Sequence, residues 1–88
     1  MKVLTVCGLG QGSSLILRMN VESVLKEMGV EADVENSDVS TAVFEKPDLI
    51  ITNKELAENL NDSSIPVVIV KNYFDKNEIR EALEFLKE

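Results

Sequence analysis

The apolar residues of this chain fall into short runs separated by polar segments, and the first run is followed by a helical pattern. Residues 2–6 are rich in Val and Leu, which is typical of a buried strand. Further on, apolar residues recur at the spacing of a helix, at Leu17, Val21, Val24, Leu25 and Met28. Ser13 or Ser14 is suited to cap the start of this helix and Gly29 to end it. The pattern predicts a strand, a glycine-rich loop and a helix.

The middle of the chain predicts two further strands, each followed by a helical segment. Residues 31–36 alternate with period two, as an outer strand with one wet face does, and residues 37–44 predict a short helix or turn. Residues 48–52 form an apolar, β-branched run, and Asn53 follows as a helix cap. The helical face expected after this cap carries Leu56, Ala57 and Leu60.

A fourth strand and a last helix are expected near the end of the sequence. Residues 66–70 are apolar and β-branched after their first residue. Asp75 and Glu78 have the spacing of a capping box, in which the second side chain returns to the backbone at the helix start. The apolar face of this helix is formed by Ile79, Ala82, Leu83 and Leu86.

Four strands that alternate with helices predict the fold class. Parallel strands need crossover connections, so we expect an α/β fold, doubly wound, with a four-stranded parallel sheet flanked by helices. The length of 88 residues suits one domain spanning residues 1–88. Ligands of such sheets bind outside the carboxyl ends of the strands, where Cys7, Asp38, Thr52 and residues 71–73 are expected to gather.

Composition narrows the classes of function. The net charge of −7 argues against a general nucleic-acid binder, which needs clustered Lys and Arg. The longest apolar runs are too short to span a bilayer, and the start lacks the pattern of a secretory signal, so a cytoplasmic protein is expected. With one Cys and no His, neither an internal disulfide nor the usual zinc ligand sets can form, and no metal or other cofactor is expected.

The charges are unevenly distributed along the chain. Between Met1 and Val21 the only charged side chains are Lys2 and Arg18, and all 16 acidic residues lie from Glu22 onward. The N-terminal loop therefore has no carboxylate near it in sequence, as an anion site requires.

The candidate chemistry lies between the first strand and the first helix, at Cys7. Glycines allow backbone N–H groups to turn inward, and the following helix adds unpaired donors and the positive end of its dipole. This field lowers the pKa of a thiol and favours a nucleophilic thiolate, which could attack a phosphoryl group. Backbone donors and the two serine hydroxyls would then hold the S-phosphate. The predicted phosphate-binding loop comprises Gly8, Leu9, Gly10, Gln11, Gly12, Ser13 and Ser14.

A purely structural role and other phosphate-binding motifs are the alternatives to this interpretation. A lone cysteine at a strand end is commonly a small hydrophobic residue, and a glycine-rich turn can serve tight packing. The combination of thiol, alternating glycines, hydroxyls and a helix start favours a functional site. A dinucleotide fingerprint fails because its third glycine is replaced by Ser13, and a Walker loop fails because the segment has no Lys.

The strongest competitor is a low-molecular-weight tyrosine phosphatase, whose phosphate loop resembles C-x5-R-[ST] on a similar fold. The position of its arginine is occupied by Ser13, and Arg18 lies five residues further along, where a helix-surface role is expected. Without that arginine or a nearby general acid, a thiophosphate is expected to await a second acceptor rather than react with water.

The segment from Cys7 to Ser14 after the first strand resembles the IIB components of sugar phosphotransferase systems, most of all the ascorbate type. Residues 15–20, 47–52 and 72–75 also look like that group. The resemblance implies that a IIA phosphohistidine donates to Cys7, with residues 8–14 holding the phosphate. Cys7 would then phosphorylate a sugar or sugar acid, L-ascorbate for the ascorbate type, bound by a membrane IIC permease. Residues 72 and 73 would either border the site or only lead into the last helix.

A third possibility is a regulatory interaction domain. Such a protein would use the phosphorylation of Cys7 as a signal to another protein and would support no sugar phosphorylation.

Overall fold

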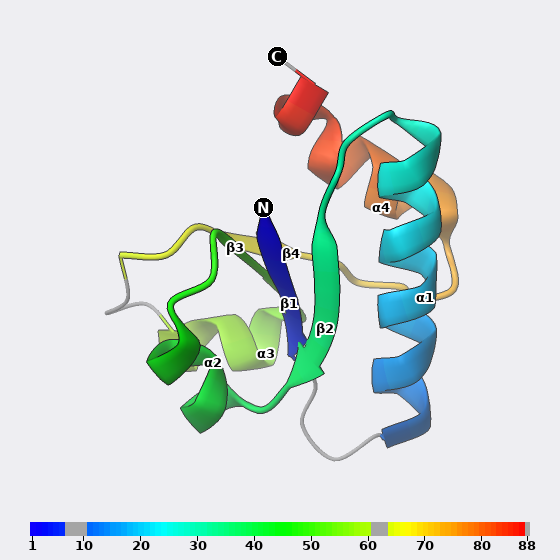
Figure 1. Cartoon of the computed structure of the whole chain (residues 1–88). Coiled ribbons are helices and arrows are strands. Elements are labelled where there is room, and N and C mark those ends of the chain that lie inside the picture. The colour runs from blue at the N-terminus through cyan, green and yellow to red at the C-terminus, as the bar shows by residue number, and fades with distance from the viewer. Residues whose placement is uncertain (7–10, 61–63, 88) are drawn as a thin grey trace.

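A parallel sheet lies at the centre of the computed structural model, which describes residues 1–6, 11–60 and 64–87, and the side chains within these ranges except 11–14, 43, 59 and 87. In this part of the chain the sheet has four strands, in the order β2-β1-β3-β4. All neighbouring pairs are parallel (Figure 1). The elements are β1 (Lys2–Val6), α1 (Gln11–Glu27), β2 (Asp33–Ser37), α2 (Val39–Glu45), β3 (Leu49–Thr52), α3 (Lys54–Ala57), the 3-10 turn η1 (Glu58–Leu60), β4 (Val67–Ile69), α4 (Lys76–Leu83) and the 3-10 turn η2 (Glu84–Lys87).

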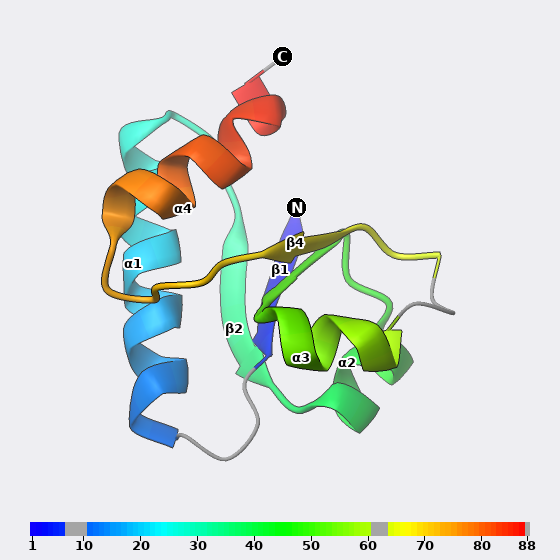
Figure 2. The same cartoon turned by 180° about the vertical axis from the view of Figure 1, so that it is seen from behind.

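Helices cover both faces of the sheet, α1 and α4 on one side and α2 and α3 on the other (Figures 1 and 2). Alternate side chains of the strands pack in two separate cores, because successive residues of a strand point to opposite faces of the sheet. Val3 and Ile51 pack in the core beneath α1 and α4, whereas Leu4 and Ile50 pack in the core beneath α2 and α3. The predicted α/β, doubly wound class is confirmed.

The end of α1 is fixed by Gly29, as the sequence predicts. Gly29 has φ +76°, and its N–H donates to the carbonyl of Lys26 at 3.1 Å. The N–H of Val30 donates to the carbonyl of Leu25 at 2.9 Å, which completes a Schellman motif. This turn reverses the chain toward β2.

The start of α1 differs from the prediction. The helix already begins at Gln11, so Ser13 and Ser14 belong to its first turn and neither is its cap. The N–H groups of a first turn have no intrahelical acceptor, so serine and glycine at these positions interrupt no hydrogen bond of the helix. A cap at Ser13 or Ser14 would start the helix at residue 14 or 15, so the prediction misplaces the start by three or four residues.

Three side chains cap the shorter helices. Asp38 accepts from Thr41 N at 2.7 Å at the start of α2. Asn53 accepts from Leu56 N at 2.8 Å at the start of α3, as predicted. Asp75 caps α4 and accepts from two backbone N–H groups, those of residues 77 and 78.

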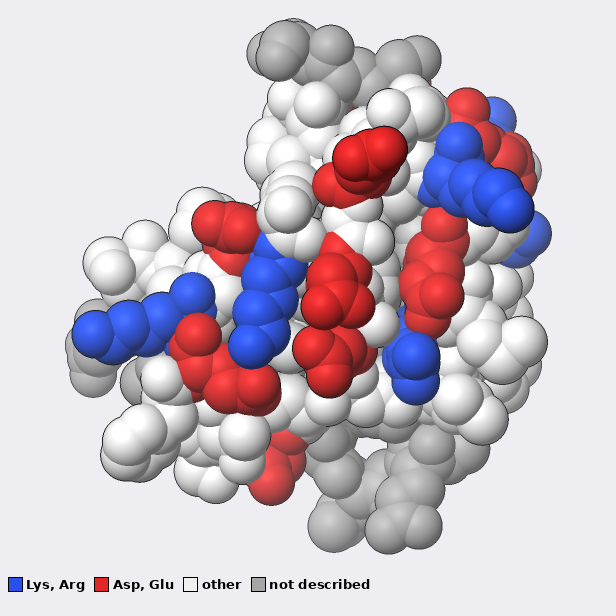
Figure 3. Space-filling model, in the orientation of Figure 1, with Lys and Arg blue, Asp and Glu red and all other residues white. Residues whose placement is uncertain are grey.

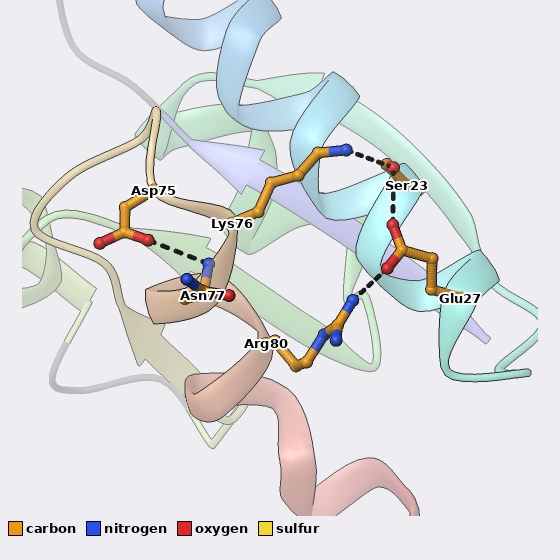
Figure 4. A network of polar contacts seen from close by, with 6 residues as sticks. All are labelled: Ser23, Glu27, Asp75, Lys76, Asn77 and Arg80. Carbon is orange, nitrogen blue, oxygen red and sulfur yellow. Dashed lines mark hydrogen bonds and ion pairs between the residues drawn. The ribbon is translucent and has the colours of Figure 1, made fainter.

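Polar contacts also tie α4 to α1 (Figure 4). The Lys76 ammonium donates to Ser23 Oγ at 2.8 Å, and Arg80 forms an ion pair with Glu27. Apolar packing of Ile79 against α1 residues lies beneath these contacts. The first turns of α4 are thereby held beside the C-terminal half of α1.

The two outer strands differ in character. Asp33 and Glu35 of β2 are exposed, and acidic side chains gather along this strand (Figure 3). β4 has only three residues and follows Pro66. No helix in the described part of the chain is both long and apolar enough to cross a membrane.

Candidate functional site

The candidate site lies at the carboxyl end of β1, an inner strand flanked by β2 and β3. Val6, the last residue of this strand, is fully buried and is in register with Ser37 of β2. Cys7 comes next in the sequence. Cys7, Gly8, Leu9 and Gly10 lie outside the described residues, so their role as thiolate nucleophile and anion-binding loop stays a prediction.

The second half of the predicted loop forms the first turn of α1. The backbone of Gln11, Gly12, Ser13 and Ser14 is helical. This turn contains no acidic residue. A helix of 17 residues thus begins four positions after Cys7. No carboxylate in its first turn offsets the positive end of the helix dipole.

A buried hydroxyl joins the ends of the inner strands. Thr52, at the end of β3, is fully buried, and its Oγ1 donates to the carbonyl oxygen of Val6 at 2.7 Å. The Thr52 carbonyl in turn accepts from Val70 N at 2.8 Å. The structure therefore brings Thr52, as predicted, to the residue that directly precedes Cys7.

Asp38 also lies at this edge, directly after β2, but its carboxylate is engaged by α2. It accepts from Thr41 N at 2.7 Å and from Ser40 Oγ at 3.0 Å. These hydrogen bonds, the one from the Thr41 backbone foremost, hold the pKa of Asp38 below its ordinary value. The side chain acts as a helix cap, and no described contact connects it to Val6 or Thr52.

The segment after β4 is held by Glu78. Its carboxylate accepts from Lys71 N at 2.6 Å and from Asn72 N at 3.1 Å. The predicted capping box is therefore half wrong: Asp75 caps α4, but its own N–H donates to the Asn72 carbonyl at 3.1 Å. Glu78 instead accepts from two backbone N–H groups that follow β4, those of Lys71 and Asn72.

Residues 71–75, which we call the β4–α4 loop, also contact α1. Asn20 Nδ2 donates to the Tyr73 carbonyl at 2.7 Å. Within the loop, Phe74 N donates to Asn72 Oδ1 at 3.0 Å. The loop is thus attached to both α1 and α4, and it leaves the sheet next to the end of β3.

Arg18 takes the helix-surface role expected of it. Its Nε donates to the Glu22 carboxylate at 2.8 Å, and the pair is four residues apart on α1. An exposed pair of this kind contributes little to stability. Arg18 is thereby oriented along the helix by its neighbour one turn later.

Three exposed apolar side chains near this edge were not identified as functional candidates from the sequence. Leu15 and Met19 of α1 are 49% and 59% exposed, and Phe74 of the β4–α4 loop is 68% exposed. The available signal was that Leu15 and Met19 lie four residues apart and outside the helical stripe that forms the core.

Known proteins resemble this chain over nearly its whole length. The family model described as "PTS system, Lactose/Cellobiose specific IIB subunit" matches residues 2–85. The ascorbate-specific PTS system EIIB component of Mycoplasma pneumoniae is 32% identical over 84 residues, which cover 92% of this chain and 88% of that protein.

A solved structure also has this fold. It is the lactose-specific IIB component domain of the phosphoenolpyruvate:carbohydrate phosphotransferase system from Streptococcus pneumoniae, with a TM-score of 0.64 and 20% sequence identity. The superposition covers 98% of this chain and 93% of that one. The likeness confirms the sheet and its helices as a fold.

Proposed function

The chain belongs to the family of IIB subunits of phosphotransferase systems, and on that premise we propose that Cys7 is its phosphoryl carrier. IIB subunits are phosphotransferases that work with IIA and IIC components. In this proposal a phosphohistidine of a IIA protein donates to Cys7, and Cys7 passes the group to a sugar bound by a membrane IIC permease. We further propose that residues 1–88 act as one cytoplasmic IIB domain.

Two displacements at phosphorus make up the reaction. The Cys7 thiolate attacks the phosphorus of the phosphohistidine, an S–P bond forms, and the N–P bond breaks with its electron pair going to the imidazole nitrogen. A sugar hydroxyl oxygen then attacks, an O–P bond forms, the S–P bond breaks with its electron pair returning to sulfur as the thiolate, and the hydroxyl proton passes to water. The thiolate is the nucleophile of the first step and the leaving group of the second, and both steps need donors for the phosphoryl oxygens.

The observation that carries the proposal is that Cys7 directly follows β1 in the sequence. β1 is an inner strand that ends at the sheet edge where α/β proteins bind ligands, and α1 begins four residues after Cys7. The backbone N–H groups in the first turn of α1 have no intrahelical acceptor and suit an anion. Donors of this kind, together with residues 8–14, would hold the phosphoryl group without a metal.

We propose L-ascorbate as the sugar substrate. The relative at 32% identity is named ascorbate-specific. The segment from Cys7 to Ser14 resembles the ascorbate type most. The family description and the solved structure at 20% identity refer to lactose and cellobiose instead. A transfer assay must therefore compare ascorbate with lactose and cellobiose, each with its own IIC permease.

Mass spectrometry of the intact protein tests the carrier role. Wild type and Cys7→Ser are incubated with phosphoenolpyruvate, the general phosphotransferase proteins and either an ascorbate-type or a lactose-type IIA protein. We expect one added phosphate on wild type only, and its loss when the matching permease vesicles and sugar are added. Equal labelling of the two proteins, or none with any donor, would contradict the proposal. Labelling without transfer to any sugar would favour a regulatory domain.

A further inference from the structure

We propose that Leu15, Met19 and Phe74 form the surface on which the phosphorylated IIA donor docks, an inference that rests on the proposed function. We call these three residues the donor surface. They come from α1 and from the β4–α4 loop, which are far apart in sequence.

Exposure distinguishes these residues from the rest of α1. The helix buries Leu17, Val21, Val24 and Leu25 against the sheet, whereas Leu15 and Met19 are 49% and 59% exposed. They lie on one helix face because residues four apart are neighbours on a helix. Single exposed apolar residues need no explanation, but a group of them beside a functional edge indicates an interaction site.

Two contacts place Phe74 beside the same part of α1. Asn20 binds the Tyr73 carbonyl at 2.7 Å, and Lys76 binds Ser23 at 2.8 Å. Phe74 lies between these two attachment points in the sequence. The backbone of Phe74 therefore lies beside the part of α1 that carries Asn20, the residue after Met19, and Phe74 itself is 68% exposed.

The surface is also close to the proposed site. Leu15 lies one helical turn after Gln11, the first residue of α1. The β4–α4 loop starts at the same edge of the sheet as the end of β1, which Cys7 follows in the sequence, since all four strands are parallel. A protein that brings a phosphorus atom to the Cys7 sulfur must cover this edge.

The β4–α4 loop is fixed before any partner binds. Glu78 holds Lys71 N and Asn72 N, and Asn20 holds the Tyr73 carbonyl. A preorganised surface loses little conformational freedom on binding, so apolar contacts there contribute to affinity rather than to ordering the loop. Exposed aromatic and methionine side chains are typical of the centre of an interface.

Charge favours the donor over the permease as the occupant. Residues 11–21 contain no acid, and residues 71–76 carry two lysines against one acid, Asp75, whose carboxylate accepts from the N–H groups of residues 77 and 78. Acidic side chains gather instead over β2 (Figure 3). A phosphohistidine is a dianion, whereas a sugar hydroxyl carries no charge, so weak negative charge around this surface assists the approach of the donor in particular.

Phosphorylation kinetics with purified phospho-IIA, of the ascorbate and the lactose type, test the inference. Met19→Ala and Phe74→Ala are expected to raise the KM for phospho-IIA by about tenfold, the usual effect of truncating a central interface residue, with kcat nearly unchanged. Phe44→Ala is the matched control, since Phe44 is 88% exposed on α2, on the other face of the sheet. We expect this control to behave as wild type.

Each outcome separates the two proposals. Equal KM values for Phe74→Ala and Phe44→Ala would overturn the donor surface while leaving the carrier role intact, and failure of wild type to accept phosphate would overturn both. Normal loading combined with slowed transfer to sugar in permease vesicles would assign the surface to the permease instead. If the variants fold poorly, titrating unphosphorylated IIA into isotope-labelled wild type decides: shifts of NMR signals must concentrate at residues 15–19 and 73–75.

Discussion

Replacing Thr52 with Val removes one buried hydroxyl directly beneath the proposed site. The Thr52 Oγ1 lies 2.7 Å from the Val6 carbonyl oxygen, and both residues are fully buried. Valine has nearly the same shape but places a methyl group where the hydroxyl was. A carbon and an oxygen prefer a separation of about 3.3 Å or more, so the two groups must move apart by roughly 0.6 Å.

The expected loss of stability follows from the lost hydrogen bond. A hydrogen bond contributes about 1 kcal/mol net to stability, and leaving the buried Val6 carbonyl without a donor adds to the cost. The free energy of unfolding should therefore fall by about 1–2 kcal/mol. For a domain of this size that lowers Tm by roughly 4–16 °C. The displaced carbonyl belongs to the residue before Cys7, and a shift approaching 1 Å can slow a reaction up to about 100-fold.

Thr52→Ser separates the hydroxyl from the methyl group. Serine keeps the donor and loses about 1 kcal/mol of apolar burial, so both variants lose similar stability. We expect only Thr52→Val to slow phosphorylation of Cys7 by phospho-IIA at 25 °C, where both remain folded. Thermal unfolding gives the stability and mass spectrometry over time gives the rate. A Thr52→Val protein that melts with wild type and loads phosphate as fast as Thr52→Ser would refute the reasoning.

Two further predictions concern helix ends. Gly29→Ala is expected to lower the free energy of unfolding by about 1–2 kcal/mol in urea, because its φ of +76° is costly for a side chain while nothing lies within 4 Å of an added Cβ. Gly29→Asn should cost less, and equal losses would contradict this. Asp38→Asn tests pH dependence. Since the pKa of Asp38 is lowered in the folded protein, its stabilisation is present above the unfolded value of about 3.8 and is lost as pH falls through the folded value. The Tm of wild type should therefore fall more steeply in acid than that of Asp38→Asn, and parallel curves would exclude this role.

The sequence predicted the parts of the fold that depend on local pattern. Period-two and helical spacings identify the strands and α1, and Gly29 marks the end of α1 because a positive φ is a local requirement. The start of α1 was misplaced because Ser13 and Ser14 suit either a cap or a first turn. The spacing of Asp75 and Glu78 predicted a capping box at the start of α4. The Glu78 carboxylate instead accepts hydrogen bonds from two backbone N–H groups after β4.

The site itself depends on strand order. Thr52 and the proposed edge were predicted from the strand ends, but the bond to Val6 requires β3 to lie beside β1, which no local pattern specifies. Phe74 was overlooked for a similar reason, since only the contact of the β4–α4 loop with Asn20 attaches it to α1. The role of Cys7 and residues 8–14 remains a prediction.

The outer strands of the sheet determine how this molecule can be approached. An unpaired strand edge readily pairs with a strand of another chain, but carboxylates on β2 and the three-residue length of β4 after Pro66 oppose such pairing. Pairing of another chain's strand with either edge of the sheet is therefore unfavourable. Transient partners that must bind and leave in each transport cycle are directed to side-chain contacts, which release more readily than a continuous ladder of backbone hydrogen bonds.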